Sequence, residues 1–354
     1  MRDAEQGVVT VMIPSYNYAE YLTECVESAA AQRDVDVVVI DNGSTDGSPE
    51  LGEHLAEVHH NVRFVRHSDN RGIIVSFNRC LEEVRGEFVS LLCADDCLTP
   101  GSIARSLEVL RTHPDVGMVY GPATVFECLG AVDVAALVSI NPGPPVVHDG
   151  RAWVEALCRT GMNPVRAPEM VVRRSVLDQV GGFEPRCPHT SDLNLWLRLA
   201  TVTDAAYLPG PAQALYRVHG RMHSGNFPYF SPMDLEQRWA GFSTFLETVT
   251  DDSLRFRWET LIRTWLGAEA RYAATRMFVA EDQPSRVADV ERLQRFAARV
   301  DPAGGSLGED LGWRLRNALG PVRSRWFPGF LPRALAHRYA HERSERRRDR
   351  IGVH

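Results

Sequence analysis

Two adjacent carboxylates, Asp95 and Asp96, follow a short apolar run at Phe88–Leu92. The run predicts a strand buried on both faces, with the carboxylate pair at its end. Two like charges there repel each other and lose hydration, and a divalent cation that binds carboxylate and phosphate oxygens relieves both costs. Taken alone, the pair equally fits a turn before a helix that is capped by Thr99 and begins at Pro100.

Three further strand-like runs precede this one at nearly even spacing, with segments of helical periodicity between them. The four expected strands are Val8–Ile13, Val35–Ile40, Val62–Arg66 and Phe88–Leu92. Two of the intervening segments carry apolar stripes, at Leu22, Cys25, Val26 and Ala29, and at Ile73, Ile74, Phe77, Leu81 and Val84. Alternating strands and helices predict right-handed crossovers and an α/β fold with a mostly parallel sheet flanked by helices.

In such a sheet the ligand site lies beyond the carboxyl ends of the strands. Pro14-Ser15-Tyr16-Asn17 follow the first expected strand, and residues 41–47, Asp-Asn-Gly-Ser-Thr-Asp-Gly, follow the second. A tyrosine ring and an acceptor for an imide N–H suit uracil or thymine, and carboxylates with a cation suit a diphosphate. Residues 41–47 alone also fit an ordinary turn before a helix capped near Ser48. The recurrence of polar loops at successive strand ends favours a binding site.

Length, composition and charge exclude several classes of protein. With 354 residues, 44% of them hydrophobic, the chain can bury a sizeable core. A net charge of −7 and a pI near 6.0 make nucleic acid an unexpected partner. No apolar run approaches the roughly 18 residues of a spanning helix, and no secretory signal pattern is present, so we expect a cytoplasmic protein. Neither the G-x-G-x-x-G nor the P-loop motif occurs at its required place.

The number and spacing of the cysteines also favour a cytoplasmic protein. Seven are dispersed along the chain, an odd number that argues against a disulfide framework and for a reducing environment. Cys93 and Cys97 stand four residues apart with no second pair nearby. We therefore expect strand and turn residues here rather than zinc ligands.

The following segments contain less regular patterns. Gly121–Pro145 is rich in Gly, Pro and Ala, and we expect a long loop, which either covers an acceptor or is a surface excursion. Met170–Arg173 predicts a strand, and Ser175–Val180 a short helix that Gly181 ends. Asp192 then opens a helix with an apolar stripe at Leu193, Trp196, Leu197 and Ala200, where a carboxylate also serves as a cap.

These segments together resemble the family 2 glycosyltransferases, inverting enzymes with the GT-A nucleotide-diphospho-sugar transferase fold. The resemblance is close over residues 8–122 and looser to about 226. It rests on V-T-V-M-I-P-S-Y-N at 9–17, V-V-V-I-D-N-G-S-T-D-G-S at 37–48, N-R-G at 70–72 with Asn78, L-L-C-A-D-D at 91–96, G-G-F-E at 181–184 before D-L-N-L-W-L-R-L at 192–199, and Y-R-V-H at 216–219.

The resemblance implies roles for individual residues. Asp192 inherits the role of catalytic base, with Glu169 as the fallback. Asp95, Asp96 and His219 are expected to hold a divalent metal, Mg²⁺ or Mn²⁺. The residues expected to bind the donor nucleotide are Pro14, Ser15, Tyr16, Asn17, Asp41, Asn42, Arg71, Asn78, Asp95 and Arg217, with Arg217 on the phosphates. The partners are a nucleotide-diphospho-sugar donor, with UDP or dTDP, and a hydroxyl acceptor.

Two departures from the family pattern leave alternatives open. Cys93 stands where the family has an Asp, which weakens the hold on ribose or metal, and Asn42 also replaces an Asp. They motivate a second hypothesis, a catalytically silent scaffold or regulator that binds nucleotide sugars. A nucleotidyltransferase of related fold is disfavoured, since no glycine-rich loop bearing Lys or Arg follows the first strand.

We expect three regions along the chain. Residues 1–122 would form the nucleotide-sugar-binding half, 123–230 the acceptor-binding half with the base, and 231–354 a helical extension. In that extension, expected stripes lie at Trp239, Phe242 and Phe245, and at Leu261, Trp265 and Ala268. The basic end at Arg338–Arg350 suggests a peripheral membrane contact, a partner-docking tail or a solvated tail.

Overall fold

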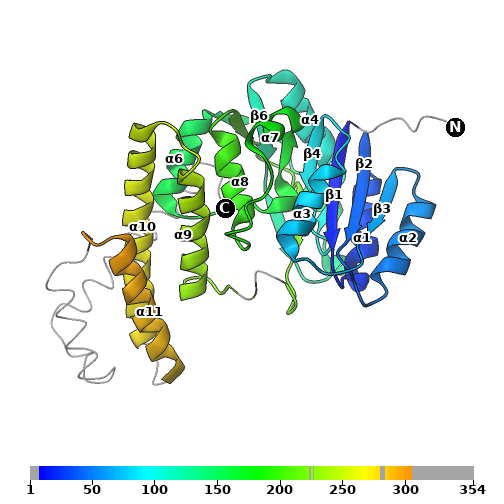
Figure 1. The fold of residues 1–354 in the computed structure, drawn as a ribbon. Helices are drawn as coiled ribbons and strands as arrows, with labels where there is room; N and C mark the ends of the chain where they lie inside the picture. Colours follow the sequence, from blue (N-terminus) through cyan, green and yellow to red (C-terminus); the bar gives the residue numbers. More distant parts are fainter. Residues whose placement is uncertain (1–7, 223–224, 226, 280–283, 305–354) are drawn as a thin grey trace. The chain divides into compact units, whose positions relative to one another are not determined.

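The computed structural model describes residues 8–222, 225, 227–279 and 284–304 (Figure 1). The described chain forms two compact units, the first made of residues up to 154 together with 163–222, and the second of 155–162 together with the described residues after 222. The expected α/β fold is confirmed in the first unit, and the described part of the expected C-terminal extension contains helices.

The first unit is built on an eight-stranded sheet with the order β3-β2-β1-β4-β9-β6-β10-β8. The strands are β1 Val9–Ser15, β2 Val35–Asp41, β3 Val62–Arg66, β4 Phe88–Leu91, β6 Val116–Tyr120, β8 Val146–His148, β9 Val171–Arg173 and β10 Asp204–Tyr207. Neighbours from β3 to β4 are parallel, as are β6 and β10, while β9 and β8 run antiparallel to their neighbours. The prediction of a mostly parallel sheet is therefore confirmed.

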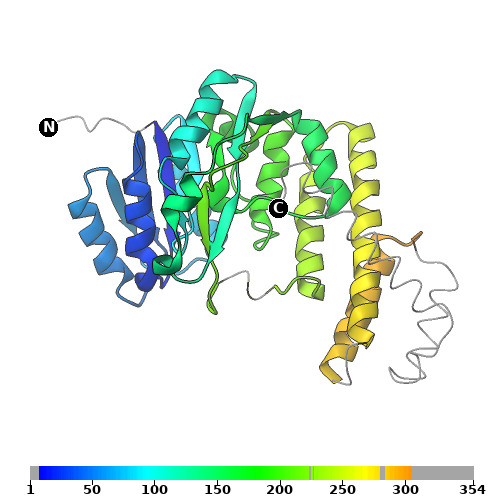
Figure 2. The same cartoon turned by 180° about the vertical axis from the view of Figure 1, so that it is seen from behind.

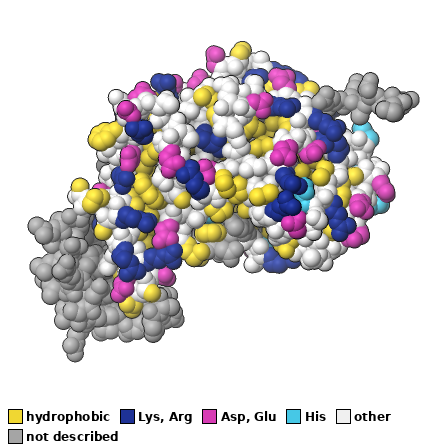
Figure 3. Space-filling view, in the orientation of Figure 1, with side chains coloured by type: hydrophobic (Ala, Val, Ile, Leu, Met, Phe, Trp, Pro, Cys, Tyr) yellow, Lys and Arg dark blue, Asp and Glu magenta, His cyan; other side chains and the backbone are white. Residues whose placement is uncertain are grey.

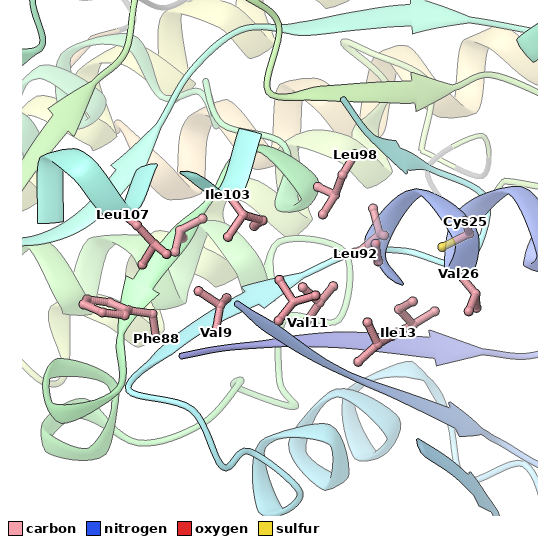
Figure 4. Packing of buried hydrophobic residues seen from close by; sticks show 14 of the residues in the cluster. Val9, Val11, Ile13, Cys25, Val26, Phe88, Leu92, Leu98, Ile103 and Leu107 are labelled. Carbon is pink, nitrogen blue, oxygen red and sulfur yellow. The ribbon is translucent and has the colours of Figure 1, made fainter. Parts of the chain in front are cut away.

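Side-chain alternation along β1 separates the two faces of this sheet. Val9, Val11 and Ile13 pack in one cluster with Val26 of α1, Ala19–Ala30 (Figure 4). Helices α2, Ser48–Val58, and α4, Ser102–Thr112, contribute to the same cluster. Helix α3, Ile73–Glu82, lies in front of the strands in Figure 1, whereas α1 lies in front in Figure 2, which is seen from behind. Both predicted helices thus cover the sheet, on opposite faces.

A second, three-stranded sheet has the order β5-β11-β7. Its strands are β5 Cys97–Leu98, β7 Ala123–Phe126 and β11 Ala214–Arg217. The prediction of a long loop at Gly121–Pro145 is wrong, because this stretch holds β7, the 3-10 turn η1 at Leu129–Ala131 and helix α5 at Val134–Val138. Phe126 packs with Leu215 and Cys97, so a partner strand far along the chain stabilises β7.

Thr99 does not cap the following helix, contrary to the turn interpretation. Helix α4 begins at Ser102 after Gly101, which has a left-handed backbone with φ 75°. The Thr99 hydroxyl instead donates to the carbonyl of Ala212, just before β11. The Thr99 side chain therefore forms a tertiary hydrogen bond and does not cap the helix.

The rest of the first unit follows the sequence patterns. It includes α6 Gly150–Thr160, which continues into the second unit, the 3-10 turn η2 Ala167–Glu169, α7 Arg174–Val180 and α8 Ser191–Ala200. Gly181 ends α7 with φ 80°, as expected. The stripe predicted on α8 is buried throughout.

The second unit contains α9 Pro232–Leu246, α10 Asp252–Val279 and α11 Pro284–Val300. Phe242 and Phe245 are buried on α9 as expected. The positions predicted for the stripe on α10 are only partly buried, and the deeply buried stripe lies one or two residues further on, at Trp258, Ile262, Leu266, Ala270 and Ala274. Arg238 is buried between Asp234 and Glu269, at 2.9 and 2.5 Å.

The charge on the surface and the hydropathy of the helices are relevant to possible binding partners. On the face shown in Figure 3, acidic and basic side chains are interspersed without a field of one sign. Among the residues that the structure describes, no helix is both long and apolar enough to cross a membrane. The basic stretch at Arg338–Arg350 lies outside the described residues, and so does its predicted membrane contact.

Candidate active site

Pairing of β5 with β11 brings the end of the Y-R-V-H segment to the two carboxylates. Leu215 pairs with Cys97 in this antiparallel ladder. Beyond the ladder, the backbone N–H of Arg217 donates to Asp96 Oδ1 at 2.8 Å. His219 Nε2 then lies 3.0 Å from Asp95 Oδ2. His219 is thereby brought to Asp95, whereas the potential ligand atoms that lie within 4.8 Å of one another come from Cys93, Asp95 and Asp96 and do not include His219.

The carboxylate pair also fits a divalent cation by its chemistry. One ligand atom each from Cys93, Asp95 and Asp96 lies within 4.8 Å of the others. Asp96 is only 1% exposed, and its Oδ2 has no hydrogen-bond partner among the described residues. Burial, with the charge of Asp95 added, raises the pKa of Asp96 well above its usual range. A bound cation would remove both penalties, so these residues fit one.

Arg217 was predicted to contact phosphate, and its geometry argues against that role. The side chain is 4% exposed. The guanidinium donates to the carbonyls of Asp95 and Glu127, at 2.7 and 3.2 Å, and pairs with Glu24 at 2.5 Å. It also lies 4.6 Å from the centre of the Tyr21 ring. Three of its five side-chain N–H donors are thus bonded within the protein, which favours a role in positioning the acidic segment.

Asp192 lies in the first turn of α8, where two donors hold its carboxylate. The Asn163 side chain donates to Oδ2 at 2.8 Å, and the N–H of Leu193 donates to Oδ1 at 2.7 Å. Burial raises the pKa of Asp192 to about 6 in spite of these bonds. The charge of Asp192 in turn helps to raise the pKa of Cys93, so the base candidate lies within electrostatic reach of the acidic segment.

Glu169, the fallback base, has different neighbours. It is buried in η2, 3.5 Å from Arg166, and burial raises its pKa to about 7. Burial raises the pKa values of Tyr120 and Tyr207, on β6 and β10, and the charge of Glu169 adds to both shifts. Apart from Arg166, these neighbours are residues of the sheet, whereas Asp192 acts directly on Cys93 of the acidic segment, which favours Asp192 as the base.

The expected base-binding loops meet at the ends of β1 and β2. Both strands are longer than predicted, so Pro14, Ser15 and Asp41 lie within the ladder, and Ser15 pairs with Asp41. Ser15 Oγ and Asp41 Oδ1 are buried and have no partner among the described residues. Tyr16, just beyond, is 40% exposed. Unpaired buried oxygens next to an accessible ring suit a polar, planar ligand.

Asn17 ties the two loops together. Its backbone is left-handed, with φ 57°. Its N–H donates to Ser44 Oγ and its Oδ1 accepts from the N–H of Thr45, both at 2.8 Å. The turn at residues 41–47 does lead into α2, with Asp46 Oδ1 accepting from the N–H of Ser48. Residues 41–47 can therefore form the turn that leads into α2 and also line a binding site.

Asn42, one of the departures from the family pattern, has a clear local role. Its Nδ2 donates to Asn70 Oδ1 at 3.0 Å, and its Oδ1 accepts from the N–H of Arg71 at 3.3 Å. The amide thus supports the N-R-G turn, which a carboxylate without a donor group cannot do in the same way. The side chain of Arg71 itself is half exposed and pairs with Asp69 at 3.1 Å.

Asn78 was predicted to contact the donor, but its amide is used in the fold. Nδ2 donates to the carbonyl of Phe183 at 3.0 Å, and Oδ1 accepts from the N–H of Phe183 at 2.7 Å. These two bonds join α3 to the G-G-F segment. We therefore interpret Asn78 as a structural residue.

Sequence reasoning missed Asn163, Arg166 and Tyr18. No motif signals Asn163 or Arg166, although Arg166 lies close enough for its charge to lower the pKa of Asp96. The Tyr18 ring lies 5.8 Å from that of His219, and burial together with Asp95 raises the pKa of its hydroxyl. Its position directly after P-S-Y-N was the one available signal.

The described fold and the acidic segment at its strand ends define a class of protein, the GT-A type of α/β transferase fold. Two solved structures share the fold. One is S. aureus TarS residues 1–349 in complex with UDP-GlcNAc, with TM-score 0.60, 17% identity and coverage of 96% of this chain and 91% of the other. The other is the mannosyltransferase PcManGT from Pyrobaculum calidifontis in complex with GDP-Man and Mn²⁺, with TM-score 0.51, 19% identity and coverage of 94% and 85%.

The family follows from the sequence comparisons. The model of glycosyl transferase family 2 matches residues 10–133. An uncharacterized glycosyltransferase from Nostoc sp. is 28% identical over 60% of this chain and 65% of its own length. An uncharacterized protein from Mycobacterium bovis is 30% identical over 61% of each chain. Residues 10–133 therefore belong to glycosyl transferase family 2, and the chain spans about three fifths of the length of these relatives.

Proposed function

We propose that this protein is an inverting glycosyltransferase that moves a sugar from a UDP- or dTDP-sugar to an acceptor hydroxyl. The proposal rests on three of the buried side-chain oxygens that have no partner among the described residues, those on Ser15, Asp41 and Asp96. They stand at or just beyond the carboxyl ends of β1, β2 and β4, where α/β sheets bind ligands. Buried polar atoms are normally paired, so a polar ligand accounts for all three.

In the proposed reaction, Asp192 accepts the proton of the acceptor hydroxyl. The hydroxyl oxygen forms a bond to the anomeric carbon while the bond from that carbon to the diphosphate oxygen breaks on the opposite side. With a pKa of about 6, the carboxylate is ionised at neutral pH and basic enough to take a proton. Asn163 and the N–H of Leu193 orient the carboxylate toward one geometry.

Asp95, Asp96 and His219 would hold Mg²⁺ or Mn²⁺, a cofactor suggested also by the Mn²⁺ complex of the mannosyltransferase of the same fold. Such an ion neutralises the charge that develops on the leaving diphosphate. The hydrogen bond between His219 and Asp95 sets the imidazole beside the carboxylate before any ion binds. The sugar-nucleotide complexes of both fold neighbours support a nucleotide-sugar donor here.

The test is Asp192→Asn, assayed with a panel of nucleotide sugars and acceptor hydroxyls. We expect turnover to fall by about 10²- to 10⁴-fold, the usual contribution of a positioned base, while donor affinity is kept. Normal turnover in this variant would remove the assignment. Donor binding without any turnover in the unaltered protein would favour the silent scaffold instead, and so would insensitivity of hydrolysis to Asp95→Asn.

A further inference from the structure

The thiol of Cys93 lies within the candidate metal site, although the sequence patterns did not predict a ligand there. Its Sγ and one carboxylate oxygen from each of Asp95 and Asp96 are mutually within 4.8 Å. This spacing fits several donors around one ion, since metal–ligand bonds of 2.0–2.3 Å place ligands on opposite sides of an ion about 4 to 4.6 Å apart. Among the described residues, the thiol makes no hydrogen bond.

The backbone of this turn is held so that the three side chains converge. The N–H of Asp96 donates to the carbonyl of Cys93 at 3.0 Å. The same carbonyl accepts a hydrogen bond from the Cys25 thiol at 3.3 Å. Arg217 holds Asp96 Oδ1 through its backbone N–H. The turn is therefore constrained on both sides before any ligand binds.

A second observation points to a ligand at this position. Asp96 Oδ2 is buried and has no partner among the described residues, while the other oxygen of the same carboxylate is already bonded. A buried carboxylate oxygen left unpaired costs free energy, and a cation satisfies it. The nearby thiols do not compete, because the Cys25 thiol is already bonded and Cys97 packs in the core of the small sheet.

We propose that Cys93 is a direct thiolate ligand, and that it shifts the metal preference of the site toward Zn²⁺ or Co²⁺ and away from Mg²⁺. The inference rests on the metal site of the proposed function and adds a ligand to it. Oxygen donors alone suit Mg²⁺ and Mn²⁺, whereas a thiolate beside the two carboxylates suits Zn²⁺ or Co²⁺ better. Formation of the sulfur–metal bond releases the thiol proton to water, so charge and atoms balance.

Co²⁺ is the probe, because a cobalt–thiolate bond has a charge-transfer absorption in the near ultraviolet that oxygen and nitrogen ligands do not produce. The full chain, titrated with Co²⁺ and no donor sugar, should show this band. Cys93→Ser should lose it, and Cys128→Ser, which changes an exposed thiol elsewhere, should keep it. Circular dichroism and thermal unfolding of each variant verify the fold. A band that persists in Cys93→Ser, or is absent from the unaltered chain, overturns the proposal.

Competition binding gives a second readout. Cys93→Asp should lower the preference for Zn²⁺ over Mn²⁺ by at least about tenfold, the scale on which changes around a metal alter its affinity. An unchanged preference overturns the proposal. A Cys93-dependent band in a chain that transfers no sugar supports the thiolate ligand while removing the transferase. Sugar transfer without any such band leaves the transferase and removes the thiolate ligand.

Discussion

The side-chain amide of Asn163 donates a 2.8 Å hydrogen bond to Oδ2 of Asp192. A donor on the ionised carboxylate favours ionisation, and this bond holds the pKa of Asp192 below the level that burial alone would give. Asn163 does not carry a proton in the proposed reaction. It positions the residue that does.

Removing this donor should move the pH profile of the reaction. In Asn163→Ala we expect the acidic limb of the kcat/KM profile to shift upward by about one pH unit, because a hydrogen bond to a charged group contributes about 1.5 kcal/mol or more. Gln179→Ala, which removes an exposed amide on α7, is the matched control and should leave the limb in place. An unshifted limb in Asn163→Ala would show that the amide does not act on the base.

Asp192→Asn should stabilise the folded protein at neutral pH. The pKa of Asp192 is raised in the folded state from 3.8 to about 6, so the folded state holds a proton that the unfolded state has lost between these values. Stability therefore falls as pH rises through this window, by about 3 kcal/mol for a shift of about two units. Denaturant unfolding at pH 7 should show this gain for the variant, and the two proteins should converge near pH 4. Equal stability at pH 7 contradicts the raised pKa.

His219→Ala should weaken metal binding without unfolding the chain. A ligand at 100 times its Kd stabilises the folded state by about 2.7 kcal/mol, so saturating Mn²⁺ should raise the Tm of the unaltered protein. In His219→Ala we expect most of this increase to disappear at the same concentration. His60→Ala, at an exposed histidine, is the control and should keep it. A full increase in His219→Ala would place the ion elsewhere.

Asn78→Ala should reduce stability and leave donor affinity unchanged. The substitution leaves the N–H and the carbonyl of Phe183 without their partner, at a cost of about 1–3 kcal/mol. Urea unfolding measures the loss, and the donor KM is measured below the new midpoint. A raised KM with unchanged stability would restore the nucleotide contact that the family resemblance implied.

Arg217→Lys should behave as a folding variant. An ammonium group does not reproduce the planar set of contacts with two carbonyls, Glu24 and the face of Tyr21, so we expect a loss of about 2 kcal/mol or more. Thermal unfolding detects this directly. An unchanged Tm together with a weakened affinity for nucleoside diphosphate would instead assign Arg217 to the phosphates.

The strands and helices that carry the site were predictable because their signals are local. Strand β1 is an apolar run that is buried along its whole length, and the buried stripe on α1 repeats with the period of a helix. Both signals are visible within a dozen residues. The order of the polar motifs then indicated which strand ends would meet, and the family comparison over residues 10–133 agrees with it.

The assignment of individual polar side chains needed the tertiary structure. Asn78 bonds to a residue 105 positions away, His219 to one 124 positions away, and Arg217 to Glu24 across 193 positions. Sequence periodicity does not encode such pairings, because they depend on strand register and chain reversal over long loops. A polar side chain at a strand end can bond to the protein or to a ligand. Whether it binds the protein or a ligand depends on which backbone groups the fold places beside it, and on whether those groups already have hydrogen-bond partners.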